Sequence, residues 1–443
     1  MSKSLAFEWD PIDQPAAIDP LERLTWCALR IRVDHRLISR VYDRSIQSER
    51  TSLYVPLFPV AEWFVHHWWP LLNEVSPSEG LPRSPLSPGQ MRWIQRHCLR
   101  SADSSSMLPA LYLFHDGRSA HAEWTADPSG SMPNMPAEFV SEGSEPIDTY
   151  AFSESAAEFI NFCLDRVSLI DDPRVHRMRN RWQAIQSADA EERRFCEVVG
   201  TMGLDPYDRS QVTDDLARFL EEKAAETGDE LLRDLTELAS PAFIEPQWQW
   251  LEAVSNEFQL GPNLMQQPFA VPQENLSPPQ FGYQLARKVR DAAKVNMNSP
   301  IDSMESLAAN IIQGPVRFED RNHVPGEGLR AVVGCSSSGE FVIAGPSPTR
   351  PDNRRFLRAR GLYHALVTTQ KSRRLVTDAF SWDQKASRAF AAELIAPQHA
   401  LVKRIPTNVV DETLLKSLSR EFNASTIVIE KQLQNAGISR SDD

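Results

Sequence analysis

The last third of the chain contains side chains of the types that bind metal ions or carry out acid–base chemistry. The candidates are His364, Asp378, Asp383, Glu393 and His399. Imidazole and carboxylate groups are common zinc ligands, and a catalytic zinc has about three of them and one open position. No regular spacing links these five residues. The alternatives are a helix histidine satisfied by a neighbour for His364, a salt-bridged or capping carboxylate for Glu393, and a surface turn for His399.

Two further motifs suggest chemistry but favour structural roles. The stretch 334–339, GCSSSG, is not a G-x-S-x-G elbow and lies between two expected strands, so it predicts a hairpin turn. His66 and His67 are adjacent on an expected helix. Adjacent helical residues point about 100° apart, so this pair cannot share a metal ion.

Two stretches with helical spacing, NRRFLRARGLYHAL at 353–366 and QKASRAFAAELIAPQHAL at 384–401, resemble the ImmA/IrrE family of metallopeptidases. In that family an R-x-x-F-x-x-A-H-E-x-x-H helix is followed by a helix of the form E-x-x-A-N-x-F-A-A-x-L-L-M-P. The most specific match is FAAEL at 390–394 with Pro397. The resemblance covers about residues 280–440. Residues 21–75 and 195–208 also look like the N-terminal extension of long members.

The resemblance can be tested position by position. It places Arg360 at the first zinc-binding His, Gly361 at the general-base Glu, His364 at the second His, and Gln384 at the downstream carboxylate. In an H-E-x-x-H helix, residues four apart share one face, so both imidazoles reach the zinc ion while the Glu handles the attacking water. Loss of a general base costs roughly 10²- to 10⁴-fold in rate, and a permanent positive charge opposes a dication. The resemblance therefore implies a zincin-like domain with a degenerate site, no catalytic residue and no cofactor. Zinc on a non-standard ligand set around His364 is the alternative.

Basic residues are concentrated around the same motifs. Between residues 354 and 404 there are eleven basic and three acidic residues, a balance of +8 in a chain of net charge −13. Such a block can form a face for DNA or an acidic partner, or can pair with acidic domains of the same chain. The candidates for the face are Arg354, Arg355, Arg358, Lys371, Arg373 and Arg374.

The segment 414–438 has the layout of a helix-turn-helix, with a short turn at 423–425. Its second helix would present a face that is apolar and poor in residues that read base edges, namely Ile427, Val428, Ile429, Glu430 and Lys431. In the family resemblance this segment is ordinary scaffold, and we expect that role.

The elements that must position these residues predict an α+β, multidomain chain. Residues 21–56 alternate in strand fashion, an amphipathic helix follows them, and Asp116-Gly117 predicts a hairpin turn. We therefore expect residues 1–150 to form a mixed α/β domain. Residues 151–260 follow helical spacing, with Asp189 as a cap and Gly203 as a stop signal. A proline-rich linker is expected at 261–280, and 281–443 forms the metallopeptidase-like domain, mainly helical with a small sheet.

Composition limits the function classes. The chain has 443 residues, 41% hydrophobic and 24% charged, which is typical of a multidomain globular protein and excludes collagenous and low-complexity classes. Five scattered cysteines without a C-x-x-C pair indicate reduced thiols in a cytoplasm. The N-terminus lacks the apolar core of a signal peptide, and no stretch suits a bilayer span.

Members of the resembled family cleave or bind helix-turn-helix repressors. The first hypothesis is therefore a cytoplasmic pseudopeptidase that binds a protein partner, such as an XRE-type repressor or an antitoxin. This role would belong to transcription regulation, toxin–antitoxin or phage-defence systems. The second hypothesis is an active zinc endopeptidase with altered ligands. The third is direct DNA binding through the basic segment. No membrane partner is expected.

Overall fold

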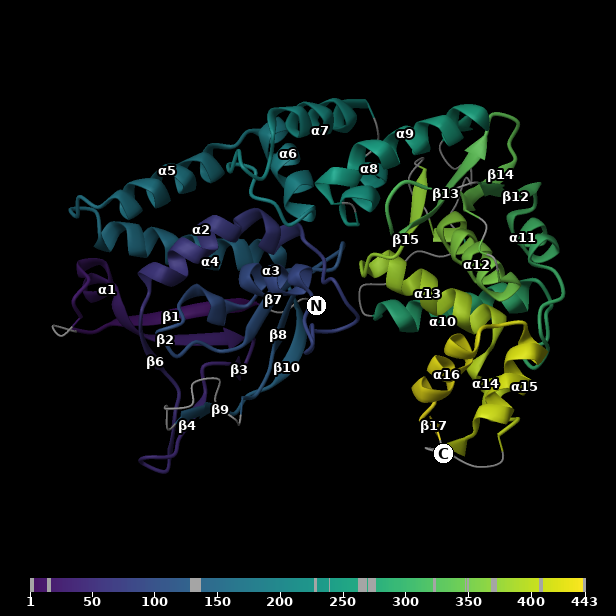
Figure 1. Cartoon of the computed structure of the whole chain (residues 1–443). Coiled ribbons are helices and arrows are strands. Elements are labelled where there is room, and N and C mark those ends of the chain that lie inside the picture. The colour runs from purple at the N-terminus through teal and green to yellow at the C-terminus, as the bar shows by residue number, and fades with distance from the viewer. Residues whose placement is uncertain are drawn as a thin grey trace. The chain divides into compact units, whose positions relative to one another are not determined.

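The computed structural model describes the whole chain except residues 1–3, 14–16, 128–136, 227–228, 239, 262–268, 270–275, 322–323, 347, 349, 368–372, 406–408 and 441–443. The chain is α+β and divides into two compact units, residues 1–224 and 225–443 (Figure 1). Each unit has its own core. One cluster of buried apolar residues runs from Leu5 to Cys196, and the other from Phe281 to Ile438. The boundaries predicted at 150, 260 and 280 stay predictions, and most of the proline-rich linker lies outside the described residues.

The first unit contains three small sheets. The four-stranded sheet consists of β1 (Leu5–Pro11), β2 (Trp26–Val33), β3 (Arg36–Leu37) and β6 (Leu53–Pro56), all antiparallel to β2. The second consists of β7 (Leu111–His115), β8 (Ala120–Trp124) and β10 (Gly143–Ile147), in the order β10-β8-β7. The third consists of β4 (Val41–Asp43), β5 (Ser48–Arg50) and β9 (Ala137–Phe139). The predicted hairpin turn joins β7 to β8, and Gly117 has a positive φ of 96°.

Helices complete the first unit. They are α1 (Pro20–Leu24), α2 (Phe58–Asn73), α3 (Pro88–His97), α4 (Thr149–Arg166), α5 (Pro173–Ser187), α6 (Ala190–Thr201) and α7 (Asp214–Glu226), with a 3₁₀ turn at Leu99–Ala102. Phe7 of β1 contacts Phe64 of α2 and Phe159 of α4, so aromatic pairs join the first sheet to its two covering helices. Asp189 caps α6 as expected by accepting from the backbone of Glu191 and Glu192.

The second unit is built on one five-stranded mixed sheet. Its strands are β11 (Leu260–Gly261), β12 (Val316–Arg321), β13 (Leu329–Ser336), β14 (Phe341–Pro346) and β15 (Arg374–Thr377). Four of the strands follow the order β11-β13-β14-β12. The fifth strand, β15, pairs with β13 in an antiparallel ladder. The sequence 334–339 forms the predicted turn between β13 and β14, with Gly339 at φ 79°.

Helices α10 (Pro278–Ala292), α11 (Met304–Ile312), α12 (Pro351–Val367) and α13 (Trp382–Ile395) pack with this sheet, preceded by α8 (Asp229–Thr236) and α9 (Pro241–Glu257). Figure 1 shows α12 and α13 side by side. Gly282 lets α10 approach α13 closely, because a Cβ atom there would lie 2.5 Å from the carbonyl oxygen of Ala386. The two predicted motif stretches are therefore neighbouring helices within one core.

The chain closes with short elements that pack on α13. They are α14 (Gln398–Val402), β16 (Val409–Val410), α15 (Glu412–Phe422), α16 (Thr426–Asn435) and β17 (Ser439–Arg440). The predicted helix-turn-helix layout is confirmed for α15 and α16, and Asn423 takes the left-handed conformation at the turn. The inner sides of these helices bury apolar side chains, among them Leu415, Leu418 and Ile429. Such burial agrees with a structural role for both helices.

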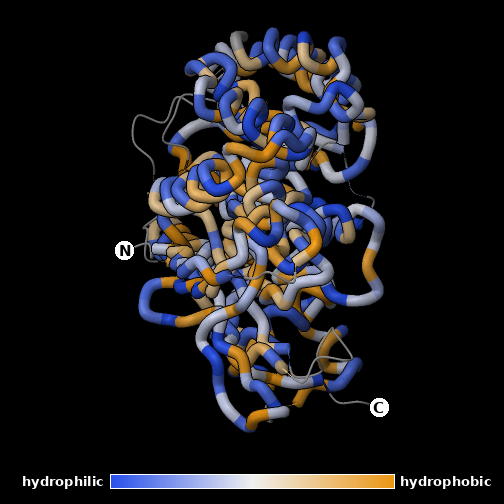
Figure 2. The backbone as a smooth tube through the Cα atoms, turned by 90° about the vertical axis from the view of Figure 1, so that its left-hand side faces the viewer, coloured by the Kyte–Doolittle hydropathy of each residue, from blue (hydrophilic) through white to orange (hydrophobic). Residues whose placement is uncertain are grey.

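Hydrophobic and hydrophilic residues alternate along most helices and strands in Figure 2. This alternation is the pattern of elements with one buried and one exposed side. Within the described part of the chain, no helix is both long and apolar enough to cross a membrane.

Candidate functional site

The buried half of α12 carries the first group of predicted site residues. Every residue from Ala359 to Val367 on this helix is buried, although the first turns are half-exposed. Gly361 faces the sheet, where a Cβ atom would lie 2.6 Å from Cδ1 of Ile343 on β14. At the position that the family resemblance assigns to a general-base Glu, Ile343 therefore occupies the space that a side chain would need.

Arg360 is a buried cation held by neutral acceptors. Its Nη2 donates to the carbonyl oxygen of Thr377 at 2.6 Å and to Oε1 of Gln384 at 2.7 Å, and its Nε donates to Oγ of Ser387 at 3.1 Å. Burial, with the nearby positive charge of Arg388, lowers the pKa of Arg360 to about 9. That value is still above neutral pH, so the guanidinium stays charged.

Gln384 joins this arginine to the edge strand of the sheet. Its Oε1 also accepts from the backbone N–H of Thr377 at 3.0 Å, and its Nε2 donates to the carbonyl oxygen of Leu375 at 2.8 Å. The N–H of Leu375 donates to Oδ2 of Asp234 at 2.9 Å. Side chains thus satisfy both N–H and both C=O groups that Leu375 and Thr377 present on the side of β15 away from β13.

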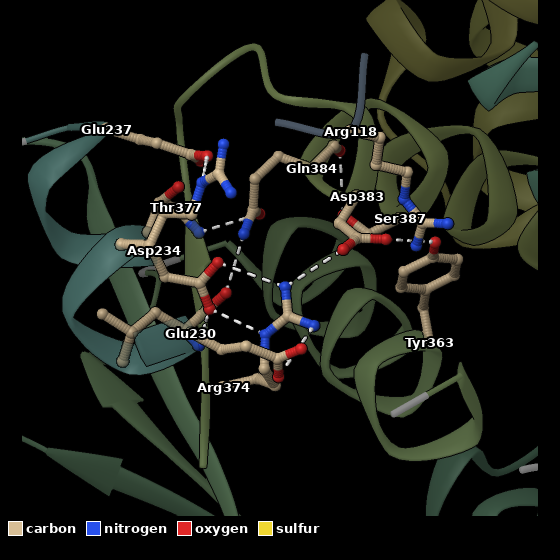
Figure 3. A network of polar contacts seen from close by, with 12 residues as sticks. Arg118, Glu230, Asp234, Glu237, Tyr363, Arg374, Thr377, Asp383, Gln384 and Ser387 are labelled. Atoms are coloured by element: carbon tan, nitrogen blue, oxygen red, sulfur yellow. Dashed lines mark hydrogen bonds and ion pairs between the residues drawn. The ribbon is translucent and has the colours of Figure 1, made fainter. Parts of the chain in front are cut away.

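A second buried cation lies beside the first. Arg374, 8% exposed, donates from Nε to Oδ2 of Asp234 at 2.9 Å and from Nη2 to Oδ2 of Asp383 at 3.1 Å. Glu230 lies 3.8 Å from its Nη1, and Tyr363 donates to the other oxygen of Asp383 at 3.1 Å. Figure 3 shows the Arg374 guanidinium between the carboxylates of Asp234 and Asp383. The short helix α8 therefore supplies the main counter-charge to β15.

Burial controls the protonation of the groups around these cations. It lowers the pKa of His364 well below its ordinary value, and the charges of Arg374 and Arg360 lower it further, so the imidazole is neutral at pH 7. Burial also raises the pKa of Asp234 against the opposing effect of Arg374. The pKa of Glu237 at the end of α8 is raised to about 7 by burial.

These residues do not fit a zinc ion. Arg360 has no lone pair to donate, Gly361 has no side chain, and Oε1 of Gln384 already accepts two hydrogen bonds. The positive charges of Arg374 and Arg360 lower the pKa of His364, which is the one imidazole among the four motif positions. The arrangement can hold the strand, two helices and α8 together, but it offers neither a ligand set nor a base for an attacking water.

The remaining metal-ligand candidates lie apart from one another. Asp378 pairs with Arg330 at 2.9 Å, and His399 is exposed at the start of α14. Glu393 is buried and bonded to Arg287 at 2.9 Å, to Gln432 at 3.0 Å and to the first turn of α14. This is the salt-bridged, capping carboxylate that the sequence suggested as the alternative. No group of three or more His, Cys, Asp or Glu side chains in the described residues could hold a metal ion.

The five basic candidates that the structure describes do not form one face. Arg374 is buried in the cluster described above, and Arg373 is half-buried next to Leu231 and Trp248. Arg354, Arg355 and Arg358 lie together on the first turns of α12. Lys371 lies outside the described residues.

Sequence reasoning missed several members of the polar network. Asp234 is 140 residues from Arg374, and no local pattern distinguishes it from the other acids of its helix. The carbonyl of Thr377 carries no side-chain signal. Ser387 could have been found, because it lies three residues after Gln384 and so shares its helix face.

Comparison with known proteins adds no relative. No family model matches this chain, and no curated protein matches it significantly.

Proposed function

We propose that the second unit is a zincin-like domain that has lost its peptidase site, and that the protein acts as a pseudopeptidase by binding another protein. The observation that carries this proposal is the position of Arg360, whose guanidinium is hydrogen-bonded to Gln384 where the resembled family has a metal ion between its ligands. A cation supplied by the chain replaces the cation supplied by the solvent. The fold is kept, while the charge balance no longer needs a metal.

The edge strand supports the same proposal. Peptides often bind by adding a strand to an exposed sheet edge, through main-chain hydrogen bonds. On β15 the groups that would pair with such a peptide are occupied by Asp234, Gln384 and Arg360. A partner is therefore bound at another surface and is not drawn across this site for cleavage.

The partner that we propose is a helix-turn-helix repressor of the XRE type, or an antitoxin, encoded beside this protein. Direct DNA binding by the basic residues has weaker support. Arg374 is buried, Arg358 pairs with Glu305, and Arg355 donates to the carbonyl of Ile301, so internal contacts already use much of the basic segment.

Co-expression with the neighbouring helix-turn-helix protein tests this proposal. We expect the two proteins to co-elute in size-exclusion chromatography and the partner to keep its full intact mass. An unrelated helix-turn-helix repressor serves as the control and should elute alone. A partner shortened by cleavage, with the shortening abolished by a chelator, would establish an active zinc endopeptidase instead. Separate elution of both intact proteins would contradict the proposal that the helix-turn-helix protein is the partner.

A further inference from the structure

A cavity of about 540 Å³ opens on the second unit, away from the polar network around Arg360. Three parts of the fold line it: the start of α11, the start of α12 with the residues before it, and the turn between α15 and α16. Its volume is within the range of about 300–1,000 Å³ that is usual for small-molecule sites. The cavity belongs to one unit and is formed by described residues.

Four arginines line this cavity: Arg350, Arg354, Arg355 and Arg358. The last three are on α12, where the i, i+3 and i, i+4 spacings place Arg355 and Arg354 next to Arg358. Because guanidinium groups repel one another, acidic partners or a bound anion stabilise such a cluster.

The acidic partners balance only part of this charge. Arg350 pairs with Asp352 at 3.0 Å, and Arg358 pairs with Glu305. Among the described residues, the acidic partner of Arg354 is Asp320 at 4.0 Å, the limit of an ion pair, and its Nη2 also donates to the carbonyl oxygen of Pro348 at 3.4 Å. Arg355 donates to a neutral acceptor, the carbonyl of Ile301.

Two buried donors at the cavity are unused. The Nε atoms of Arg354 and Arg355 are buried and have no hydrogen-bond partner among the described residues. A buried N–H without a partner costs about 1–3 kcal/mol, so an acceptor that reaches it is favoured. Burial lowers the pKa of Arg355, against the opposing effect of the charges of Glu305 and Asp302.

We propose that this cavity binds the phosphate group of a small phosphorylated ligand. Phosphate oxygens match the fork of an arginine in geometry and charge. The N-termini of α11 and α12, at Met304 and Pro351, both border the cavity and add positive potential. The carboxylates of Asp302, Glu305 and Asp352 also border it and would repel a long phosphate backbone, so a compact ligand fits better than nucleic acid.

Titration calorimetry of the full-length protein with inorganic pyrophosphate tests the proposal. We expect saturable binding that weakens roughly tenfold in Arg355→Gln, because one charge-assisted contact is lost. Arg354→Gln should weaken it similarly, and it is the safer variant because its own partners are distant, Asp320 at 4.0 Å and the carbonyl oxygen of Pro348 at 3.4 Å. Arg317→Gln on β12 is the matched control, since Arg317 is half-exposed and ion-paired outside the cavity, and its affinity should equal that of the wild type.

Three results would overturn the proposal. One is the absence of saturable pyrophosphate binding at millimolar concentration. Another is equal loss of affinity in the Arg317→Gln control, which would show a diffuse charge effect. The third is binding of a DNA duplex, but not of pyrophosphate, that depends on Arg354 and Arg355. None of these bears on whether the protein binds a repressor, so this inference and the proposed function fail separately.

Discussion

At the scale of single residues, the second unit contains a buried cation that neutral acceptors hold. Arg360 keeps its charge in a buried position because three oxygen atoms accept from it, and one of them belongs to Gln384. Burying a charge is costly unless it is fully hydrogen-bonded, so these contacts are the condition for its presence. The neutral state of His364 follows from the same surroundings, because two fixed positive charges and burial all disfavour its protonation.

The resemblance to a zinc site can be tested by restoring its ligands. In a variant with both Arg360→His and Gln384→Glu, we expect stoichiometric zinc after purification without chelators, measured by mass spectrometry of the metal content. The reason is that the two positions are already within hydrogen-bond distance, and His364 is four residues further along the same helix face.

The matched control carries the same types of substitution nearby, Arg388→His with Gln398→Glu, and should hold no more zinc than the wild type. If the restored variant also holds no zinc above that level, the assignment of these positions to a former metal site is wrong. If the wild type itself contains stoichiometric zinc that is lost on His364→Ala, the pseudopeptidase proposal is wrong.

At the scale of elements, the informative feature is an edge strand closed by side chains. Strand β15 has β13 on one side, and on the other side Asp234 from α8, Arg360 from α12 and Gln384 from α13 take the place of a neighbouring strand. Unpaired edges invite association with other chains, and covering them is a common protection. Here the cover consists of side chains, so it joins a strand and three helices through one network.

Hydrogen exchange can measure this closure. We expect the amide of Thr377 to exchange slowly in the wild type and to lose protection selectively in Gln384→Leu, because Oε1 of Gln384 is its acceptor. Protection should be read relative to Val376, which pairs with β13, so that a general loss of stability is factored out. The unfolding free energy should fall by about 1–3 kcal/mol, since the variant leaves buried polar groups unsatisfied.

Gln432→Leu is the control for this experiment, because Gln432 is also a buried glutamine that bonds to a backbone carbonyl and a side chain. This variant should lower the stability of the protein without changing the ratio of the exchange protection of the Thr377 amide to that of the Val376 amide. An unchanged ratio in Gln384→Leu would show that the edge is protected by something other than this side chain.

At the scale of the whole molecule, two cores and an uneven charge distribution divide the chain. Residues 225–443 carry 24 basic and 26 acidic residues, which leaves 23 basic and 34 acidic residues in 1–224. The net charge of −13 is therefore located mainly in the first unit. Because the two buried clusters share no residue, the units are expected to unfold in separate transitions.

Differential scanning calorimetry of matched glycine variants tests that expectation. Gly361→Ala would press a methyl group on Ile343, and Gly200→Ala would press one on the backbone of Trp69, where a Cβ would lie 2.7 Å from the carbonyl oxygen. Each should cost about 1–3 kcal/mol by overpacking. Gly361→Ala should lower the transition temperature of the second unit by several degrees and leave that of the first unit unchanged. Gly200→Ala should lower the transition temperature of the first unit and leave that of the second unit unchanged.

Gly314→Ala is the control, because no atom lies within 4 Å of a Cβ at that position, and neither transition should fall. A single transition that shifts in both Gly361→Ala and Gly200→Ala would show that the chain unfolds as one cooperative structure.

The sequence by itself predicted what depends on neighbours along the chain. The helices around 353–366 and 384–401, the turns at Gly117 and Gly339 and the cap at Asp189 all follow from periodicity, from the φ values that glycine tolerates and from one side chain reaching its own backbone. Through the resemblance to a family motif, the sequence also predicted that Arg360 and Gln384 belong to one candidate site. These two residues do meet, because each lies on the inner face of its helix.

Tertiary structure alone decided how that site is completed and where the charges lie. Asp234 reaches Arg374 across 140 residues, and Ile343 excludes a side chain at Gly361. Within the basic block that looks continuous in the sequence, Arg360 and Arg374 are buried, whereas Arg354, Arg355 and Arg358 line the cavity. The physical reason is that charge and hydrogen-bonding capacity are satisfied in space, by whichever element the fold brings near, and spacing along the chain carries no record of those partners.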